Sequence, residues 1–248
     1  MILIPNPQHA DIIDQKDTMY PTEMISISDD FVIDNTVGNM YGFCTKGSFA
    51  IHGEQTWTIN ENDFFTIKTP LDGETPIEML EEGQLFVIIR YGFRGIDMVG
   101  HSEKNGRLSY IDGCTDSLLV MPPRLGDPCL NYLHFPMGID QTQHLHPSIR
   151  MGIVIGGKGE AFQKPEGKLK GWEEDLTKGM MFCLEEGEVH SFRTAESYMD
   201  IIAYHPDSDF GPTDDEHPMI NRTIVGGQRA NEQDEIRTKK IHEGLWES

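Results

Sequence analysis

Three histidines in the second half of the sequence have the residue type and the spacing of metal ligands. His144 and His146 are two residues apart, and side chains two apart on a β-strand point to the same face. If a strand begins near His144, both imidazoles and Arg150 share that face. His190 follows the turn sequence EEGE, so we expect it to open a neighbouring strand and supply a third ligand. Neutral imidazole nitrogen binds Zn, Fe, Ni, Cu or Mn well.

The sequence around these histidines resembles the two motifs of the cupin superfamily over residues 119–205. The first motif has a glycine, five residues, His-x-His, three or four residues, a glutamate, six residues and a glycine. The second has a glycine, five residues, Pro-x-Gly, two residues, a histidine, three residues and an asparagine. The positions that match are Gly138, His144, His146, Gly157, Gly179, Gly187 and His190. Glu185 stands where the family has proline, and Thr194 stands where it has asparagine.

The resemblance implies a metal site in which the family's glutamate ligand is replaced by Arg150. Arginine stays protonated and cannot ligate a metal. The implied site is therefore three histidines plus water or substrate, as in some cupin dioxygenases that use three-histidine iron. We predict one divalent transition metal ion per chain, with Fe2+ favoured and Zn2+, Mn2+ and Ni2+ as alternatives. For Arg150 there are two hypotheses: a catalytic group that binds an anionic substrate beside the metal, or a structural salt bridge with Glu160 or Glu188.

Short strand-like runs separated by turn residues form two series, residues 31–93 and 119–205. Residues 94–118 are polar and predict a linker, residues 1–30 an N-terminal arm or cap, and residues 206–248 a covering loop and tail. The first series resembles a cupin barrel that has lost its metal, similar to the sensing domain of AraC-type regulators. It has no His-x-His pair, and His52 stands alone. We therefore predict an all-β bicupin, with two tandem cupin (jelly-roll) β-barrels and a degenerate N-terminal one.

Other polar and thiol groups near the motifs have structural interpretations. His134 is expected to pack in the core or at its rim, and Cys183 to be a small buried apolar residue. The late-loop residues are expected to be turn formers and surface groups, some of which could line the barrel mouth: His205, Asp207, Asp209 and His217. Tyr204 and Gln143 are weaker candidates for contacts around the metal ligands.

Composition narrows the choice of partners. The 248 residues carry a formal net charge of −21, which repels a phosphate backbone and argues against nucleic acid. The first residues lack a signal-peptide pattern, and the sequence lacks the run of about 18 apolar residues that a membrane span needs. We expect a cytoplasmic protein that forms a homodimer or higher homo-oligomer and does not bind membranes.

Two classes of function remain open. Three neutral ligands leave the metal ion at its full charge, and Arg150 adds a second cation, so a small anionic metabolite is the expected substrate. Dioxygenase-type chemistry ranks first and isomerase or lyase chemistry second, because a metal with open positions can activate O2 or polarise substrate oxygens. The other class is a non-catalytic small-ligand-binding or sensor protein. The fold alone does not choose between them.

Overall fold

The computed structural model describes residues 1–34, 37–104, 106–124, 126–165 and 170–207, together with a short pair of strands, β18 (Ile224–Val225) and β19 (Gln228–Arg229). The chain divides into two compact units, Met1–Ser208 and Asp209–Ser248. Most of the predicted covering loop and tail, including Asp209 and His217, lies outside the described residues.

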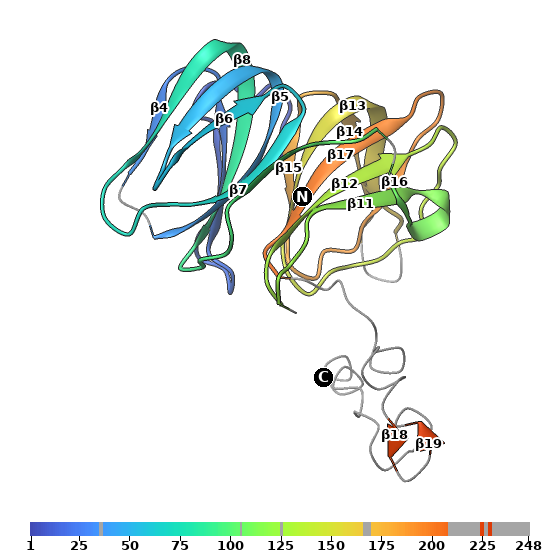
Figure 1. Ribbon diagram of the computed structural model, residues 1–248. Helices are drawn as coiled ribbons and strands as arrows, with labels where there is room; N and C mark the ends of the chain where they lie inside the picture. The colour runs from blue at the N-terminus through green and yellow to red at the C-terminus, as the bar shows by residue number, and fades with distance from the viewer. Residues whose placement is uncertain are drawn as a thin grey trace. The chain divides into compact units, whose positions relative to one another are not determined.

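The first unit is built from β-strands, as predicted, with one turn of 3-10 helix, η1 (Ile111–Gly113), among its described residues (Figure 1). Its strands form two antiparallel sheets. Among the described residues, no strand pairing closes either sheet on itself, so the two closed barrels of the prediction are not confirmed. No helix in this part of the chain has the length and apolar character needed to cross a membrane.

The first sheet has eight strands in the order β2-β3-β8-β5-β7-β9, with β4 paired to β8 and β6 to β5. Their bounds are β2 (Ile12–Gln15), β3 (Thr22–Ile27), β4 (Phe31–Ile33), β5 (Gly38–His52), β6 (Thr56–Asn60), β7 (Asp63–Lys68), β8 (Thr75–Tyr91) and β9 (Met98–His101). The two long strands β5 and β8 pair at the centre of the sheet, and both are curved along their length (Figure 1).

The second sheet has nine strands in the order β1-β15-β13-β17-β12-β11-β10, and β14 and β16 both pair with β13. Their bounds are β1 (Ile2–Ile4), β10 (Leu108–Ser109), β11 (Thr115–Val120), β12 (Cys129–Phe135), β13 (Arg150–Gln163), β14 (Trp172–Thr177), β15 (Met181–Leu184), β16 (Ser191–Arg193) and β17 (Met199–His205). This sheet carries all the residues of the two cupin-like motifs that lie on strands.

The long strands β5 and β13 each contain a glycine in the left-handed region of backbone conformation. Gly47 has φ +73° and lies where β5 shifts register against β8, and Gly157 has φ +66° close to the register shift of β13 against β17. A Cβ at either position would collide with a backbone carbonyl of the partner segment. Only glycine fits such a bulge without strain. The two glycines therefore have the same local role in the two sheets.

The segments expected to be an arm and a linker contribute strands. From the first 30 residues, β2 and β3 join the first sheet, whereas β1 pairs with β15 of the second sheet, Ile2 opposite Cys183. From residues 94–118, β9 pairs with β7 in the first sheet, and β10 pairs with β11 in the second. The domain boundaries drawn from the sequence stay predictions.

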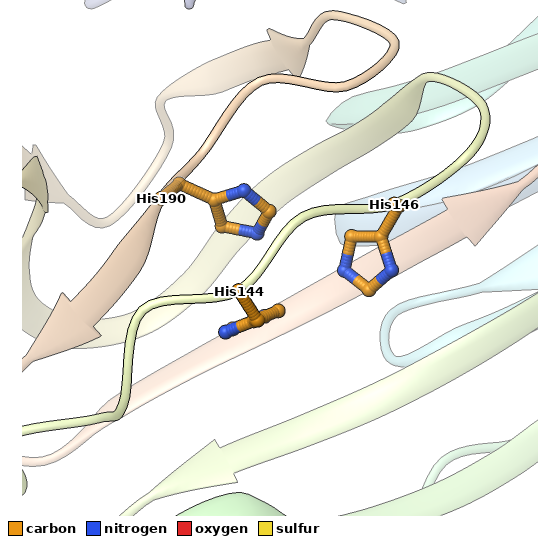
Figure 2. A group of neighbouring side chains, drawn as sticks. All are labelled: His144, His146 and His190. Carbon is orange, nitrogen blue, oxygen red and sulfur yellow. The ribbon is translucent and has the colours of Figure 1, made fainter. Parts of the chain in front are cut away.

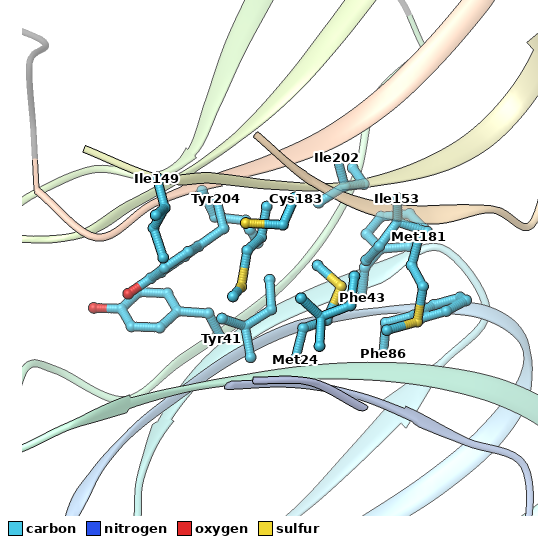
Figure 3. Close-up of a cluster of buried hydrophobic side chains, with 14 of the residues drawn as sticks. Met24, Tyr41, Phe43, Phe86, Ile149, Ile153, Met181, Cys183, Ile202 and Tyr204 are labelled. Carbon is cyan, nitrogen blue, oxygen red and sulfur yellow. The ribbon is translucent and has the colours of Figure 1, made fainter. Parts of the chain in front are cut away.

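Apolar side chains fill three clusters. One lies inside the first sheet and includes Phe49 and Phe65. A second joins the two sheets, and Figure 3 shows Met24 and Phe86 of the first sheet facing Met181 of the second. Burying a side chain of this size contributes about 1.5–3 kcal/mol. The third cluster lies inside the second sheet and forms the packed wall behind the histidines.

Candidate metal centre

His144, His146 and His190 lie together, as their spacing predicts (Figure 2). One nitrogen from each ring can be chosen so that the three atoms all lie within 4.8 Å of one another. The ring centroids are 4.5 Å apart for His144 and His190, 5.2 Å for His144 and His146, and 5.3 Å for His146 and His190. No other group of three histidine, cysteine or acidic residues in the described part of the chain has this geometry.

The backbone brings the histidines together by a route that differs from the sequence prediction. The strand begins at Arg150 and not near His144, because residues 147–148 form a bend between them. Pro147 has no backbone N–H to offer a strand ladder. Instead, His144 and His190 form an isolated antiparallel bridge in which each backbone N–H donates to the other residue's carbonyl at 2.9 Å. The Gly187 N–H also donates to the His146 carbonyl at 3.0 Å.

Hydrogen bonds to backbone carbonyls set the orientation of two of the rings. Nδ1 of His144 lies 2.9 Å from the Thr142 carbonyl oxygen, and Nδ1 of His190 lies 2.8 Å from that of Glu188. A carbonyl only accepts, so Nδ1 carries the proton in both rings and the lone pair of a neutral ring is on Nε2. Carbonyl partners of this kind commonly orient histidines that ligate metals.

His190 is held in the neutral form that metal binding requires. Its exposed fraction is 1%. Burial lowers the pKa of His190 to about 3, and the nearby His144, His146 and Arg150 add to this effect, while the bond to the Glu188 carbonyl opposes it. A metal and a proton compete for the same lone pair. Because the ring is already neutral at pH 7, metal binding does not have to displace a proton from it. The donor set therefore fits a divalent transition metal.

The histidines line a small cavity inside the second sheet. Most of its wall is apolar and comes from strands β12, β13, β15, β16 and β17: Leu133, Phe135, Met151, Phe182, Leu184, Phe192, Ile201 and Ala203. The polar lining residues besides the three histidines are Tyr110, Gln141, Arg150 and His205. The free volume is about 30 Å³, which accommodates roughly two water molecules. Apolar walls of this kind strengthen electrostatic interactions inside the cavity.

Arg150 lies in the cavity wall, and its salt bridge is with a residue that the sequence analysis did not choose. Its exposed fraction is 4%. Its Nη1 donates to the carbonyls of Ser148 and Ile149 at 3.1 and 2.9 Å, and lies 3.5 Å from Oδ1 of Asp207. The Ser148 hydroxyl bonds both the guanidinium and the Asp207 carboxylate. Asp207 is therefore a charged partner of Arg150 and is linked to it through Ser148.

The two acidic partners proposed for Arg150, Glu160 and Glu188, bind other groups. The Glu160 carboxylate pairs with Arg193. The Glu188 carboxylate accepts a hydrogen bond from the Glu185 N–H at 2.8 Å. The salt-bridge hypothesis for Arg150 was right in kind and wrong in partner, because the partner lies 57 residues further along the chain.

The two weaker candidates for contacts around the metal ligands, Tyr204 and Gln143, lie elsewhere. Tyr204 is fully buried in the cluster between the sheets, with its ring 5.1 Å from that of Tyr41, so its predicted place around the metal ligands is wrong. Gln143 accepts a hydrogen bond from the Lys164 N–H and does not line the cavity, whereas Gln141, which the sequence analysis passed over, does. No sequence signal marks Gln141, since its burial follows from the pairing of its backbone N–H with the Phe192 carbonyl at 3.0 Å.

Two further histidines have clear positions. His205, for which a surface site or the barrel mouth was expected, ends β17, is 8% exposed and lines the cavity 6.0 Å from the His146 ring. His134 lies in β12 with Nδ1 2.7 Å from the Asp200 carboxylate, which confirms its packing at the rim. Cys183 is fully buried in the cluster between the sheets, also as predicted.

The first sheet has no counterpart of this centre in its described residues. His52 lies at the end of β5, where its ring nitrogens are 3.1 Å from the Thr56 hydroxyl and 3.4 Å from the Glu78 carboxylate. Its side chain is 38% exposed. The apolar cluster inside the first sheet includes Phe49, Phe65 and Ile51.

Comparison with known proteins finds the similarity at the level of structure. No family model matches the sequence, and no curated protein sequence matches it. The solved structures that match include a cupin 2 conserved barrel domain protein from Leptotrichia buccalis, with 17% identity and a TM-score of 0.53, covering 82% of this chain and 94% of that one. An IolB-like protein from Salmonella typhimurium has 9% identity and a TM-score of 0.63, covering 85% and 94%.

A third match is oxalate decarboxylase from Bacillus subtilis, a protein with Mn(II) centres, with 7% identity and a TM-score of 0.56, covering 85% of this chain and 78% of that one. Identities this low carry information on the fold and not on the reaction. The arrangement of strands agrees with these neighbours. The chain has the cupin fold.

Proposed function

We propose that the protein is a metal-dependent cupin enzyme that binds one divalent transition metal ion per chain through His144, His146 and His190. The observation that carries the proposal is the convergence of three ring nitrogens within 4.8 Å in a largely apolar cavity. The hydrogen bonds that fix the tautomers of His144 and His190 support it, because they leave Nε2 as the donor atom. Fe2+ is the favoured ion, and Zn2+, Mn2+ and Ni2+ are the alternatives.

We further propose a small anionic metabolite as the substrate. A divalent ion held by three neutral ligands keeps its full charge, and it would polarise substrate oxygens or, as Fe2+, activate O2. The small free volume of about 30 Å³ favours a small substrate. Oxalate decarboxylase, which shares the fold, has Mn(II) centres, so Mn2+ is included among the ions to be tested.

The chain's own residues would bind and enclose the substrate. The phenylalanine and leucine side chains of the wall exclude water. Arg150 holds a positive charge in the cavity wall, with Ser148 and Asp207 fixing its position. Dioxygenase chemistry ranks first among the candidate reactions, and a lyase or isomerase reaction second, because both need an ion with open positions and a site closed to bulk water.

O2 consumption with a panel of small acids tests the catalytic part of the proposal. The protein is purified without oxygen, loaded with Fe2+ or Mn2+, and mixed with oxalate, glycolate, pyruvate and similar acids in an oxygen electrode and by mass spectrometry. His52→Ala is the matched control, since His52 is a histidine at a strand end outside the centre. Turnover that is present in His52→Ala and absent in His146→Ala supports the proposal. Turnover that survives His146→Ala contradicts it.

A non-catalytic binding or sensor protein is the second candidate. The first sheet supports it, because the first strand series resembles a sensing domain and its described residues contain no group of metal-ligand type. Stoichiometric binding of an acid to the metal-loaded protein, with no product and no O2 uptake over hours, would select this candidate.

The finer architecture is also a proposal. We propose a bicupin with tandem barrels at residues 31–93 and 119–205, the first of them degenerate. The apolar cluster inside the first sheet and the exposed position of His52 support it. A homodimer or higher homo-oligomer and a cytoplasmic location stay predictions, and light scattering coupled to size-exclusion chromatography measures the first of these.

A further inference from the structure

Gln141 is a buried amide in the wall of the histidine-lined cavity. Its exposed fraction is 1%. Its backbone N–H donates to the Phe192 carbonyl at 3.0 Å, which holds the residue against strand β16. It lines the same cavity as His144, His146 and His190, so its side chain belongs to the environment of any ligand bound there.

The amide of Gln141 is poorly satisfied by the protein. Its Nε2 has a weak contact with the Cys114 sulfur at 3.9 Å. Its Oε1 is buried and has no hydrogen-bond partner among the described residues. A buried carbonyl oxygen without a donor destabilises a folded protein, and such groups are rare unless a ligand or an ordered water supplies the donor.

We propose that the oxygen of Gln141 accepts a hydrogen bond from a hydroxyl group of the substrate, and that the substrate is a small hydroxy acid. This inference rests on the proposed function, because the carboxylate of such an acid would be held by the metal ion. The three histidines would hold a metal ion for the acid group, Gln141 with its unpartnered oxygen lines the same cavity, and most of the remaining wall is apolar. Its free volume of about 30 Å³ favours the smallest members of the class.

A site built to accept a hydrogen bond discriminates strongly against the analogue that lacks the donor, because its own polar group is then left unpaired. Glycolate and acetate are a matched pair for this purpose, since a hydroxyl group replaces a hydrogen of the methyl group. The wild-type protein loaded with Zn2+ should bind glycolate at least about tenfold more tightly than acetate, the ratio expected for one such unpaired group. Isothermal titration calorimetry measures both constants.

The variant Gln141→Met keeps the length of the side chain and removes the acceptor. It should lower the ratio of the two binding constants by about tenfold, the part that the Gln141 acceptor contributes. Gln143→Met is the control, because Gln143 is the same residue type in the same segment but lies outside the cavity. The control should keep the wild-type ratio and Zn2+ stoichiometry.

A second measurement needs neither metal nor ligand. Because Gln141→Met removes an unsatisfied buried oxygen, the metal-free variant should melt about 2–4 °C above the metal-free wild type. A residue whose role was structural would show the opposite sign. Loss of Zn2+ binding by the wild type would refute the proposed function, and the melting comparison would still decide the status of Gln141.

Three results would overturn the inference. The first is a wild-type protein that binds glycolate no better than acetate, which is measured without any variant. The second is a Gln141→Met protein that keeps the wild-type ratio. The third is a metal-free Gln141→Met protein that melts at or below the wild-type temperature, because the buried oxygen would then have had a partner.

Discussion

The replacement Arg150→Gln tests how the cavity wall is held together. It removes a buried guanidinium that binds the carbonyls of Ser148 and Ile149 and pairs with Asp207. Breaking a buried pair costs about 3–5 kcal/mol, and we expect the lower end, about 3 kcal/mol, because Asp207 keeps a side-chain exposure of 15%. For a chain of this size each kcal/mol shifts the melting temperature by about 2–4 °C, so the expected fall is about 6–12 °C.

Urea unfolding followed by circular dichroism measures the change, and Arg193→Gln is the matched control. Arg193 also pairs with two acidic residues, Glu160 and Glu173, but its side chain is 37% exposed. An exposed pair contributes at most about 1 kcal/mol. Two results would contradict this prediction. One is a free energy of unfolding for Arg150→Gln within about 1 kcal/mol of the wild-type value, the limit for an exposed pair. The other is an equal loss of stability in Arg193→Gln.

The same variant separates the two roles of Arg150. The three histidines do not depend on it as a ligand, so Arg150→Gln should keep its metal. If the guanidinium also anchors the anionic substrate, the affinity of the loaded variant for glycolate should fall about tenfold or more, as for loss of one hydrogen bond to a charged group. Unchanged affinity with lowered stability would assign Arg150 a structural role alone.

Three further outcomes follow from the described contacts. Arg150→Glu should destabilise the metal-free protein, because the new carboxylate faces that of Asp207. The variant should bind Zn2+ more tightly than the wild type does, so its melting temperature should rise more on Zn2+ loading. Asp116→Asn should stabilise the protein at pH 7.5 and not at pH 4. The reason is that burial raises the pKa of Asp116 from 3.8 to about 6. Ionisation of Asp116 therefore destabilises the folded state by up to about 3 kcal/mol above pH 6, and has no such effect below pH 4, where the group is protonated in both states. Urea titrations at the two pH values measure this difference. Tyr204→Phe should leave the Zn2+ affinity unchanged, because its ring packs between the sheets, and a weakened affinity would return Tyr204 to the metal environment.

The clustering of the three histidines could be predicted because their spacing is a compact pattern in the sequence. Two ligands two residues apart and a third after a turn are local features, and the spacing between the glycines that bound them is set by strand length. The prediction was right about the cluster and wrong about its cause. A short antiparallel bridge between His144 and His190, and not one continuous strand, brings the rings together.

The surroundings of the centre could not be predicted, because they depend on contacts between distant segments. Asp207 reaches Arg150 across 57 residues. Gln141 and Gln143 have the same side chain in the same polar run, and only the pairing with Phe192 decides which of them is buried. β1 is three residues long and has no readable period, and its partner strand β15 begins at Met181.

Metal content tests the central claim most directly. Wild-type protein, His144→Ala, His190→Ala and the control His52→Ala are purified without oxygen, dialysed against a weak chelator and analysed by elemental mass spectrometry. We predict about one divalent ion per chain in the wild type and the control. Each ligand variant should lose about 3 kcal/mol or more of binding free energy, which empties the site under these conditions. Near-stoichiometric metal in both ligand variants would contradict the assignment of His144, His146 and His190 as the metal centre.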